Sequence, residues 1–396
     1  MKKLYSFIFL VLLTASADAQ TQYGWIQKSS LPAVGRHRST ALSCGNRGYV
    51  GLGHVNSVVD VLYQDWWEYD PGTDTWSQKA DYAGGLRYHA TGFTIGNYMY
   101  VGTGRDPSAT LHQDFWKYNP ANNTWTSIAA LPGGARRGAV GFEISGYGYV
   151  GTGSYYGDFY KYDPTLNSWT AVASIPTGRI SAVGMSLNGK GYCGTGDVGG
   201  NSGDWWEYDP ANNTWTARAN LPGLPRMEAC GFAMQGRCFL GTGDNYSSGD
   251  NYADMWAFNP STNQWVQVAD FAGAARRYLV AISLNGKAYA GTGTSGMNYN
   301  DWWEYGTISG MEETTIPTVN VYPVPSAGPV NFEFSTVVEN NITCILYDAS
   351  GRAVRISNFE SCGKFSLYKE DLPAGTYTYS ITSNSDFIGS GKIIFQ

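Results

Sequence analysis

The sequence lacks the features that mark nucleic-acid-binding and membrane-spanning proteins. Its 396 residues carry 26 Lys and Arg against 32 Asp and Glu, a formal net charge of −6. Nucleic acids and anionic membranes are bound by clustered positive charge, so this balance argues against either as a partner. Beyond the N-terminus, no apolar run is long enough to cross a bilayer.

Cysteine and histidine, the common soft metal ligands, are also scarce, with six and four residues. The cysteine spacings match no zinc or haem motif. The histidines all fall in the first third of the chain, at His37, His54, His89 and His112. A metal or catalytic role for them remains an alternative, but no spacing places two of them on neighbouring strand positions. We therefore predict no metal and no cofactor.

The first residues have the pattern of a secretory signal peptide. Lys2 and Lys3 precede a largely apolar stretch, residues 4–13, which leads to the small residues Ala17 and Ala19. This pattern predicts that residues 1–19 are removed, with cleavage near Ala19. Export to an oxidising compartment permits disulfides, and a Cys344–Cys362 bridge is left open.

Glycine and aromatic residues, by contrast, are abundant, with 50 glycines and 15% aromatics, which is typical of many short strands and tight turns. An arginine stands fifteen residues before a Gly-x-Gly sequence in six places. These arginines are Arg36, Arg87, Arg136, Arg179, Arg226 and Arg276. Repetition with a period of 40 to 50 residues predicts a propeller or a solenoid.

Each repeat has the pattern of four short antiparallel strands. In the clearest copy they are expected at residues 90–95, 98–102 and 115–118, with the fourth starting at Trp125. An Asp-Pro or Asn-Pro turn precedes the fourth strand in five repeats. The order of Arg, small-residue strand, Tyr-Val-Gly, Tyr-Asn-Pro and Trp resembles the kelch repeat over about residues 23–305. The resemblance implies an all-β propeller with a four-stranded sheet in each blade, although Gly-Thr-Gly replaces the usual glycine pair.

The ends of the repeat region indicate how the ring closes. The sixth repeat stops at Tyr305 without a following Trp, whereas Trp25 precedes the first repeat. A strand around Trp25 that completes the sixth sheet would remove an unpaired edge. We therefore predict a six-bladed propeller over residues 20–306, closed by an N-terminal strand.

The remaining chain is predicted to be a polar linker, residues 307–317, and a small β-sandwich, residues 318–396. Four ordered motifs, residues 321–325, 347–352, 371–377 and 391–395, resemble the C-terminal sorting domain of the type IX secretion system. Val324 stands where that family usually has Asn. The resemblance implies the type IX machinery as a partner. It also implies a secreted or outer-membrane-surface location in a Gram-negative bacterium, and leaves open whether the protein is released or attached.

The loops between the second and third strands vary in length and should share one face with the segment before the first strand. Variable loops on a rigid scaffold are the usual place for binding. One Arg and one Asp occur per repeat on this face, and we expect them to pair structurally, with anion binding by the arginines as the alternative.

Residues that differ between repeats are the better candidates for ligand contact. Two positions after each Arg stand Arg38, His89, Gly138, Ser181, Glu228 and Tyr278. We predict that these residues contact a polar ligand such as a sugar. The alternative is that they only line the central channel around water. The variable loops add five tyrosines as stacking candidates, namely Tyr155, Tyr156, Tyr246, Tyr252 and Tyr299.

These residues favour a protein- or glycan-binding module. The alternative is a carbohydrate-active enzyme, because six-bladed kelch relatives include sialic acid epimerases; His89 and Glu228 are then the candidate acid/base pair. A galactose-oxidase-like copper site is disfavoured, since no propeller cysteine is clearly on the loop face. The acidic loop from Asp244 to Asp254 offers oxygen ligands, but its spacing differs from the calcium-loop pattern.

Overall fold

A computed structural model describes residues 23–56, 60–245, 247–307, 319–338, 341–349, 351–383 and 386–396. The predicted signal peptide, residues 1–19, and all but the first residue of the predicted linker lie outside these ranges. Every regular element in the described part of the chain is a β-strand, and no helix there is suited to crossing a membrane. The chain divides into two compact units, residues 1–308 and 309–396.

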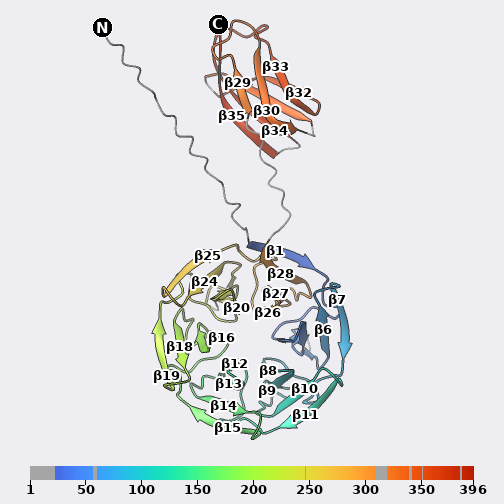
Figure 1. The fold of residues 1–396 in the computed structure, drawn as a ribbon, viewed down its shortest axis with the longest axis vertical. Coiled ribbons are helices and arrows are strands. Elements are labelled where there is room, and N and C mark those ends of the chain that lie inside the picture. The colour runs from blue at the N-terminus through green and yellow to red at the C-terminus, as the bar shows by residue number, and fades with distance from the viewer. Residues whose placement is uncertain are drawn as a thin grey trace, which may run out of the picture. The chain divides into compact units, whose positions relative to one another are not determined.

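The first unit is a closed ring of six four-stranded antiparallel sheets (Figure 1). Five sheets use four successive main strands. These are β2 (Thr40–Cys44), β3 (Arg47–Gly51), β6 (Trp66–Asp70) and β7 (Thr75–Lys79); β8 (Thr91–Ile95), β9 (Tyr98–Gly102), β10 (Phe115–Asn119) and β11 (Thr124–Ile128); β12 (Ala139–Ile144), β13 (Tyr147–Thr152), β14 (Phe159–Asp163) and β15 (Ser168–Val172); β16 (Val183–Leu187), β17 (Lys190–Gly194), β18 (Trp205–Asp209) and β19 (Thr214–Arg218); β20 (Cys230–Met234), β21 (Arg237–Gly241), β24 (Met255–Asn259) and β25 (Gln264–Val268). Two variable loops also contain two-residue hairpins, β4 (His54–Val55) with β5 (Val61–Leu62) and β22 (Asp244–Asn245) with β23 (Asp250–Asn251).

The sixth sheet confirms the predicted closure. It joins β26 (Val280–Leu284), β27 (Lys287–Gly291) and β28 (Trp302–Thr307) to β1 (Tyr23–Lys28), which lies at the outer edge beside β28 (Figure 1). Trp25 is paired with Tyr305 in the register, and its ring lies 5.0 Å from that of Tyr305 and 5.1 Å from that of Phe271. The two ends of the repeat region are thereby tied into one sheet.

The first strand of each blade lines the central axis, where neighbouring blades converge. Small residues are needed there: a Cβ added to Gly141 would lie 2.5 Å from the carbonyl oxygen of Gly92 in the next blade. Further out, aromatic side chains fill the space between sheets. Tyr69, for example, packs against Trp76 at 4.9 Å and Trp302 at 6.1 Å. Blade packing therefore explains the repeating Tyr and Trp.

The outer-strand tryptophans tie each of five blades to the residue that directly follows the neighbouring blade's outer strand. Trp125 Nε1, for instance, donates to the Ala80 carbonyl at 3.0 Å, while Asn123 Oδ1 accepts from the Ala80 N–H at 2.8 Å. The same donor position recurs at Trp76, Trp169, Trp215 and Trp265. Each ring and its turn thus satisfy backbone groups that would otherwise be unpaired.

The second unit is a two-sheet sandwich. One sheet contains β29 (Val319–Tyr322), β30 (Val330–Val338) and β33 (Cys362–Leu367); the other contains β32 (Ala353–Phe359), β31 (Ile342–Tyr347), β34 (Gly375–Ser383) and β35 (Asp386–Phe395). Phe332 stacks on Phe365 at 4.7 Å within a core of its own. Cys344 and Cys362 are free thiols, as are Cys44, Cys193, Cys230 and Cys238.

Candidate functional site

The repeated arginines form buried ion pairs with the repeated aspartates. All six arginines are at most 2% exposed. Each guanidinium meets one carboxylate in two contacts, in the pairs Arg36–Asp65, Arg87–Asp114, Arg136–Asp158, Arg179–Asp204, Arg226–Asp254 and Arg276–Asp301. Two-point pairing of this kind is strong and geometrically specific. The arrangement supports the prediction that the repeated arginines pair with the repeated aspartates in a structural role, rather than binding an anion.

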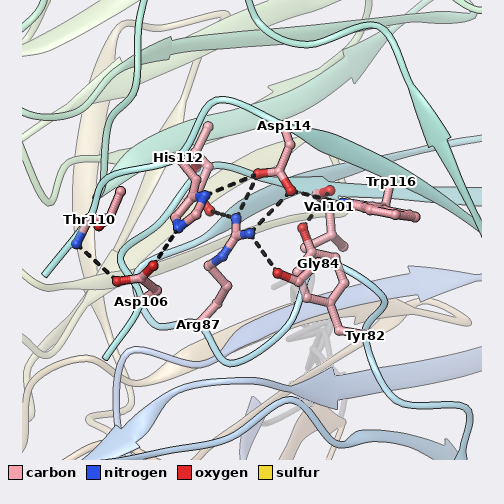
Figure 2. Close-up of polar contacts among 10 residues, drawn as sticks. Tyr82, Gly84, Arg87, Val101, Asp106, Thr110, His112, Asp114 and Trp116 are labelled. Atoms are coloured by element: carbon pink, nitrogen blue, oxygen red, sulfur yellow. Dashed lines mark hydrogen bonds and ion pairs between the residues drawn. The ribbon is translucent and has the colours of Figure 1, made fainter. Parts of the chain in front are cut away.

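Blade two shows the arrangement in detail (Figure 2). Arg87 contacts Asp114 at 2.7 and 3.1 Å and also donates to the Gly84 carbonyl, while Trp116 Nε1 donates to the same carboxylate at 2.9 Å. These contacts hold the pKa of Asp114 below its usual value against the opposing effect of burial. His112 lies beside this pair and bonds through Nε2 to Asp106 at 3.0 Å.

Above the arginines, the six predicted ligand positions form a backbone ring at the mouth of the channel. All six have a left-handed backbone, with φ between 56° and 63°. The N–H of His89 donates to the carbonyl of Arg38. The same backbone hydrogen bond joins the ring position of each following blade to that of the blade before it, as far as Tyr278. A left-handed non-glycine residue costs on the order of 1 kcal/mol. Since all six positions adopt this conformation, the backbone strain is a property of the repeated architecture. The blades differ at these positions only in their side chains.

A second set of side chains reaches the mouth from the positions next to this ring. The residue after each repeated arginine pairs through its backbone with the residue after Gly-x-Gly. The antiparallel bridges are His37–His54, Tyr88–Arg105, Ile180–Asp197, Met227–Asp244 and Arg277–Thr294. In blade three, the Ser154 N–H donates to the Arg137 carbonyl. These bridges show that the two loop segments share one face.

Arg38 is the centre of the side-chain contacts. Its guanidinium donates to the Tyr278 hydroxyl, contacts His54 Nε2 at 2.9 Å and lies 3.9 Å from Glu228 Oε1. The Tyr278 ring lies 4.0 Å beneath the Arg38 guanidinium carbon and 5.1 Å from the His89 ring. The fold therefore brings Arg38, His89, Glu228 and Tyr278 together.

Blade five contributes two acidic residues to the mouth, Glu228 and Asp244. Arg277 Nη1 bonds to Asp244 at 2.6 Å, and its Nε lies 3.6 Å from Glu228 Oε2. Burial raises the pKa of Glu228 to about 8, with a further increase from Asp244, despite the opposing effects of the arginines. Glu228 is thus largely protonated at neutral pH. Asp244, part of the loop considered for calcium, is fully buried beside Arg277.

Three of the four histidines are held neutral. Burial, followed by the charge of Arg38, lowers the pKa of His37 to about 4. Burial and the neighbouring His37 and Arg38 lower the pKa of His54 to about 3, and that of His89 also falls well below its usual value. Within the described ranges, no three His, Cys, Asp or Glu side chains are grouped to hold a metal ion.

Two cavities follow the axis. A small one of about 150 Å³ is lined by all six ring positions, Ser181 included. A larger one of about 440 Å³ lies along the first strands, between residues such as Ser39, Gly141 and Ser283. Ligand pockets usually hold roughly 300 to 1,000 Å³. The small cavity therefore suits one group of a ligand, while the rest would lie on the loops.

The predicted tyrosines have different surroundings. Tyr156, Tyr252 and Tyr299 lie over the buried arginines of their own blades, at 4.6, 4.7 and 3.7 Å. Tyr155 is 55% exposed, and its hydroxyl donates to Asp197 at 2.5 Å. Tyr246 lies outside the described residues.

Sequence reasoning missed part of the mouth, namely Tyr88, Arg105, Arg137 and Arg277, and considered Asp244 only as the start of a possible calcium loop. The signal was present, since these positions differ between repeats while the flanking Arg and Gly-x-Gly recur. They escaped notice because the backbone bridges that aim them at the axis are tertiary contacts.

Comparison with known proteins agrees with this architecture. The family model described as "Kelch motif" matches residues 86–132, and that described as "Secretion system C-terminal sorting domain" matches residues 320–396. A solved structure entitled "Structure of YjhT" is similar, with a TM-score of 0.59 and 20% identity, covering 69% of this chain and 95% of that one. At this identity the likeness establishes the fold alone. A search of curated proteins finds no match.

The two family matches fall on the two compact units. The first lies in the ring of six sheets, and the second spans almost the whole sandwich. The sorting domain implies export by the type IX secretion machinery, to the surroundings or the cell surface. The chain is a kelch-type β-propeller joined to the C-terminal sorting domain of a secretion system.

Proposed function

We propose that the propeller is a binding module, and that a glycan or a protein docks on its variable-loop face at the channel mouth. The signal peptide and the sorting domain would carry this module to the exterior of a Gram-negative bacterium. The function lies in recognition outside the membrane.

One observation carries this proposal. Several buried polar atoms without a hydrogen-bond partner lie at the mouth, among them Arg38 Nε, His89 Nδ1, Glu228 Oε2 and Asp244 Oδ1. Other such atoms, on the Thr of Gly-Thr-Gly and on the first Trp of the third strands, recur from blade to blade and belong to the repeat. An unsatisfied buried polar group costs about 1–3 kcal/mol. The atoms at the mouth belong to residues that differ between blades, which supports a surface completed by polar groups of a ligand, with solvent in their place when it is absent.

The protonation of Glu228 favours a second candidate, the epimerase-like enzyme. A carboxyl with a pKa of about 8 can donate a proton at neutral pH, and a neutral imidazole such as His89 can accept one. Both side chains line the same small cavity. Binding is the better supported of the two. Two guanidinium groups already contact Glu228, and the cavity of about 150 Å³ that Glu228 and His89 line is smaller than a usual ligand pocket.

A glycan array with the mature chain from Gln20 tests both candidates. We expect retention of specific glycans, weakened at least tenfold by His89→Ala and unchanged by Arg237→Gln, whose position is on the opposite face. Bound sugars are then incubated with the protein and followed by NMR for epimerisation. Turnover abolished by Glu228→Gln would establish the enzyme. Equal retention by wild type and His89→Ala would contradict binding at the mouth.

A further inference from the structure

Two arginines from adjacent blades share one neutral acceptor at the mouth. Arg105 Nη1, from blade two, donates to the Tyr88 hydroxyl at 2.8 Å. Arg137 Nη1, from blade three, donates to the same oxygen at 3.4 Å. Two positive charges therefore converge on a single phenol group.

The backbone fixes both arginines in this arrangement. Tyr88 and Arg105 exchange backbone hydrogen bonds of 3.1 and 3.0 Å. The Arg137 N–H donates to Ser154 Oγ at 3.1 Å, and its carbonyl accepts from the Ser154 N–H at 3.0 Å. The two cations thus project from paired segments rather than from free loop tips, and their approach is built into the fold.

Neither positive charge is in direct contact with a carboxylate in the described part of the chain, although the charge of Arg137 also acts to lower the pKa of Glu228. Within the described ranges, neither Arg105 nor Arg137 forms an ion pair with a carboxylate. The adjacent acids are engaged elsewhere, because Asp106 accepts from His112 and from the Thr110 N–H, and Asp197 accepts from Tyr155 and from the Gly199 N–H. Arg277, on the other side of the mouth, is in contrast paired with Asp244 at 2.6 Å.

We propose that Arg105 and Arg137 bind the oxyanion, a carboxylate or a sulfate, of an acidic glycan. Tyr88 accepts two N–H groups, which leaves its own hydroxyl hydrogen free to donate to the same anion. Bound there, the anion separates two like charges and forms charge-assisted hydrogen bonds. This inference rests on the proposed function, of which it specifies the ligand class.

The neighbouring surface favours a glycan over an acidic peptide. Tyr155 directly follows Ser154, the residue paired with Arg137, and presents a ring that is 55% exposed. Its hydroxyl is held by Asp197, so the ring needs little ordering when a ligand arrives. A flat, pre-positioned aromatic surface beside a pair of cations suits the apolar face of a sugar ring whose substituent is charged.

The anion site is tested first with inorganic sulfate on the mature chain. Thermal unfolding is compared in sodium sulfate and in sodium chloride at equal ionic strength. We expect sulfate to raise the Tm of the wild type and of the control Arg237→Gln further than that of Arg105→Gln and Arg137→Gln, which keep only the general stabilisation that sulfate gives a folded protein. In dilute chloride the two mouth variants should unfold at the same or a higher temperature than the wild type, because a like-charge contact is relieved. An equal sulfate response in all four proteins would overturn the site.

The ligand class is tested on an array that contains carboxylated, sulfated and neutral glycans. We expect retention of acidic glycans only, with the Kd raised at least tenfold by each mouth variant, equivalent to about 1.4 kcal/mol. Retention of neutral glycans, unaffected by either variant, would overturn this inference while leaving the proposed function intact. Absence of any glycan binding, with retention of an acidic peptide instead, would overturn the choice of a glycan.

Discussion

Glu228 shows how a single residue depends on the blades around it. It is the blade-five member of a ring whose other members include Arg38 and Tyr278, and it is 8% exposed. Opposite charges from Arg38 and Arg277 would normally lower the pKa of a carboxyl, but removal from water outweighs them and raises it to about 8. The surroundings of Glu228 therefore favour its neutral form.

This makes the stability of the propeller depend on pH. In the unfolded chain Glu228 titrates near 4.5, whereas in the folded protein it titrates near 8. Between these values the folded state binds more protons, so the free energy of unfolding falls as pH rises, by at most about 1.4 kcal/mol per pH unit, and levels off above pH 8.

We expect Glu228→Gln to remove this dependence. The variant should lose less Tm than the wild type between pH 5 and pH 8.5, since an amide cannot ionise. Thermal unfolding at constant ionic strength measures this, with Glu143→Gln, at the other end of the channel, as the matched control. Parallel Tm profiles for the wild type and Glu228→Gln would show that the carboxyl titrates in the ordinary range.

The histidines act in the opposite direction on the acid side. His37 and His54 titrate near 4 and 3 in the folded protein but near 6.5 when unfolded. Below about pH 6.5 the unfolded chain binds more protons, so stability falls as the solution becomes more acidic. Below pH 6.5 the two histidines outweigh Glu228, and above it only Glu228 acts, so these groups together favour folding most near pH 6.5.

Among the elements, β1 closes the ring, because it comes from the start of the repeat region and pairs with β28 at its end. Its outward side is exposed, as Ile26 at 44% shows. Its inward side places Trp25 against Phe271, Tyr305 and Phe232, the last at 6.3 Å. These contacts with blades five and six, together with the backbone pairing to β28, anchor the segment that leads into the first blade.

Trp25→Ala should weaken this closure. Loss of a packed Trp side chain costs about 3 kcal/mol or more. Urea denaturation should show a fall of this order in the free energy of unfolding, and amide exchange should accelerate first in β28. The control Ile26→Ala, on the exposed side of the same strand, should change stability by less than about 0.5 kcal/mol. If both variants were equally stable, another contact would have to hold the ring closed.

At the scale of the whole molecule, the two units have separate cores. The sandwich buries Phe332, Phe365 and Ile381 within itself, and the propeller is complete once β1 pairs with β28. Folding of the ring therefore has no evident need for the sorting domain.

A chain that ends at residue 307 should test this division. We expect its propeller to unfold at the same temperature as in the full-length protein, and the truncated protein to remain in the periplasm of a host with a type IX system. Calorimetry and cell fractionation measure the two effects, with a reporter fused to residues 308–396 as the export control. A truncated chain that fails to fold would contradict the independence of the units.

The sequence alone was sufficient to predict the repeated architecture. Six blades, the strand around Trp25 that closes the sixth, and a structural pairing of the repeated Arg and Asp all follow from spacing and turn chemistry. That each pair forms within one blade was shown only by the structure. These features are local or recur at one fixed interval, so every additional copy confirms them. The sorting domain was predictable for a similar reason, because its motifs occur in a fixed order at the end of the chain.

The composition of the mouth was decided by the tertiary structure. The ring positions such as Arg38 and Glu228 were found from their variation, but the sharing of Tyr88 by Arg105 and Arg137 was not. Arg38 and Tyr278 are 240 residues apart in sequence and bond only because the ring is closed. Side chains at the axis meet across blades, and no periodicity within one chain segment records which of them will face one another.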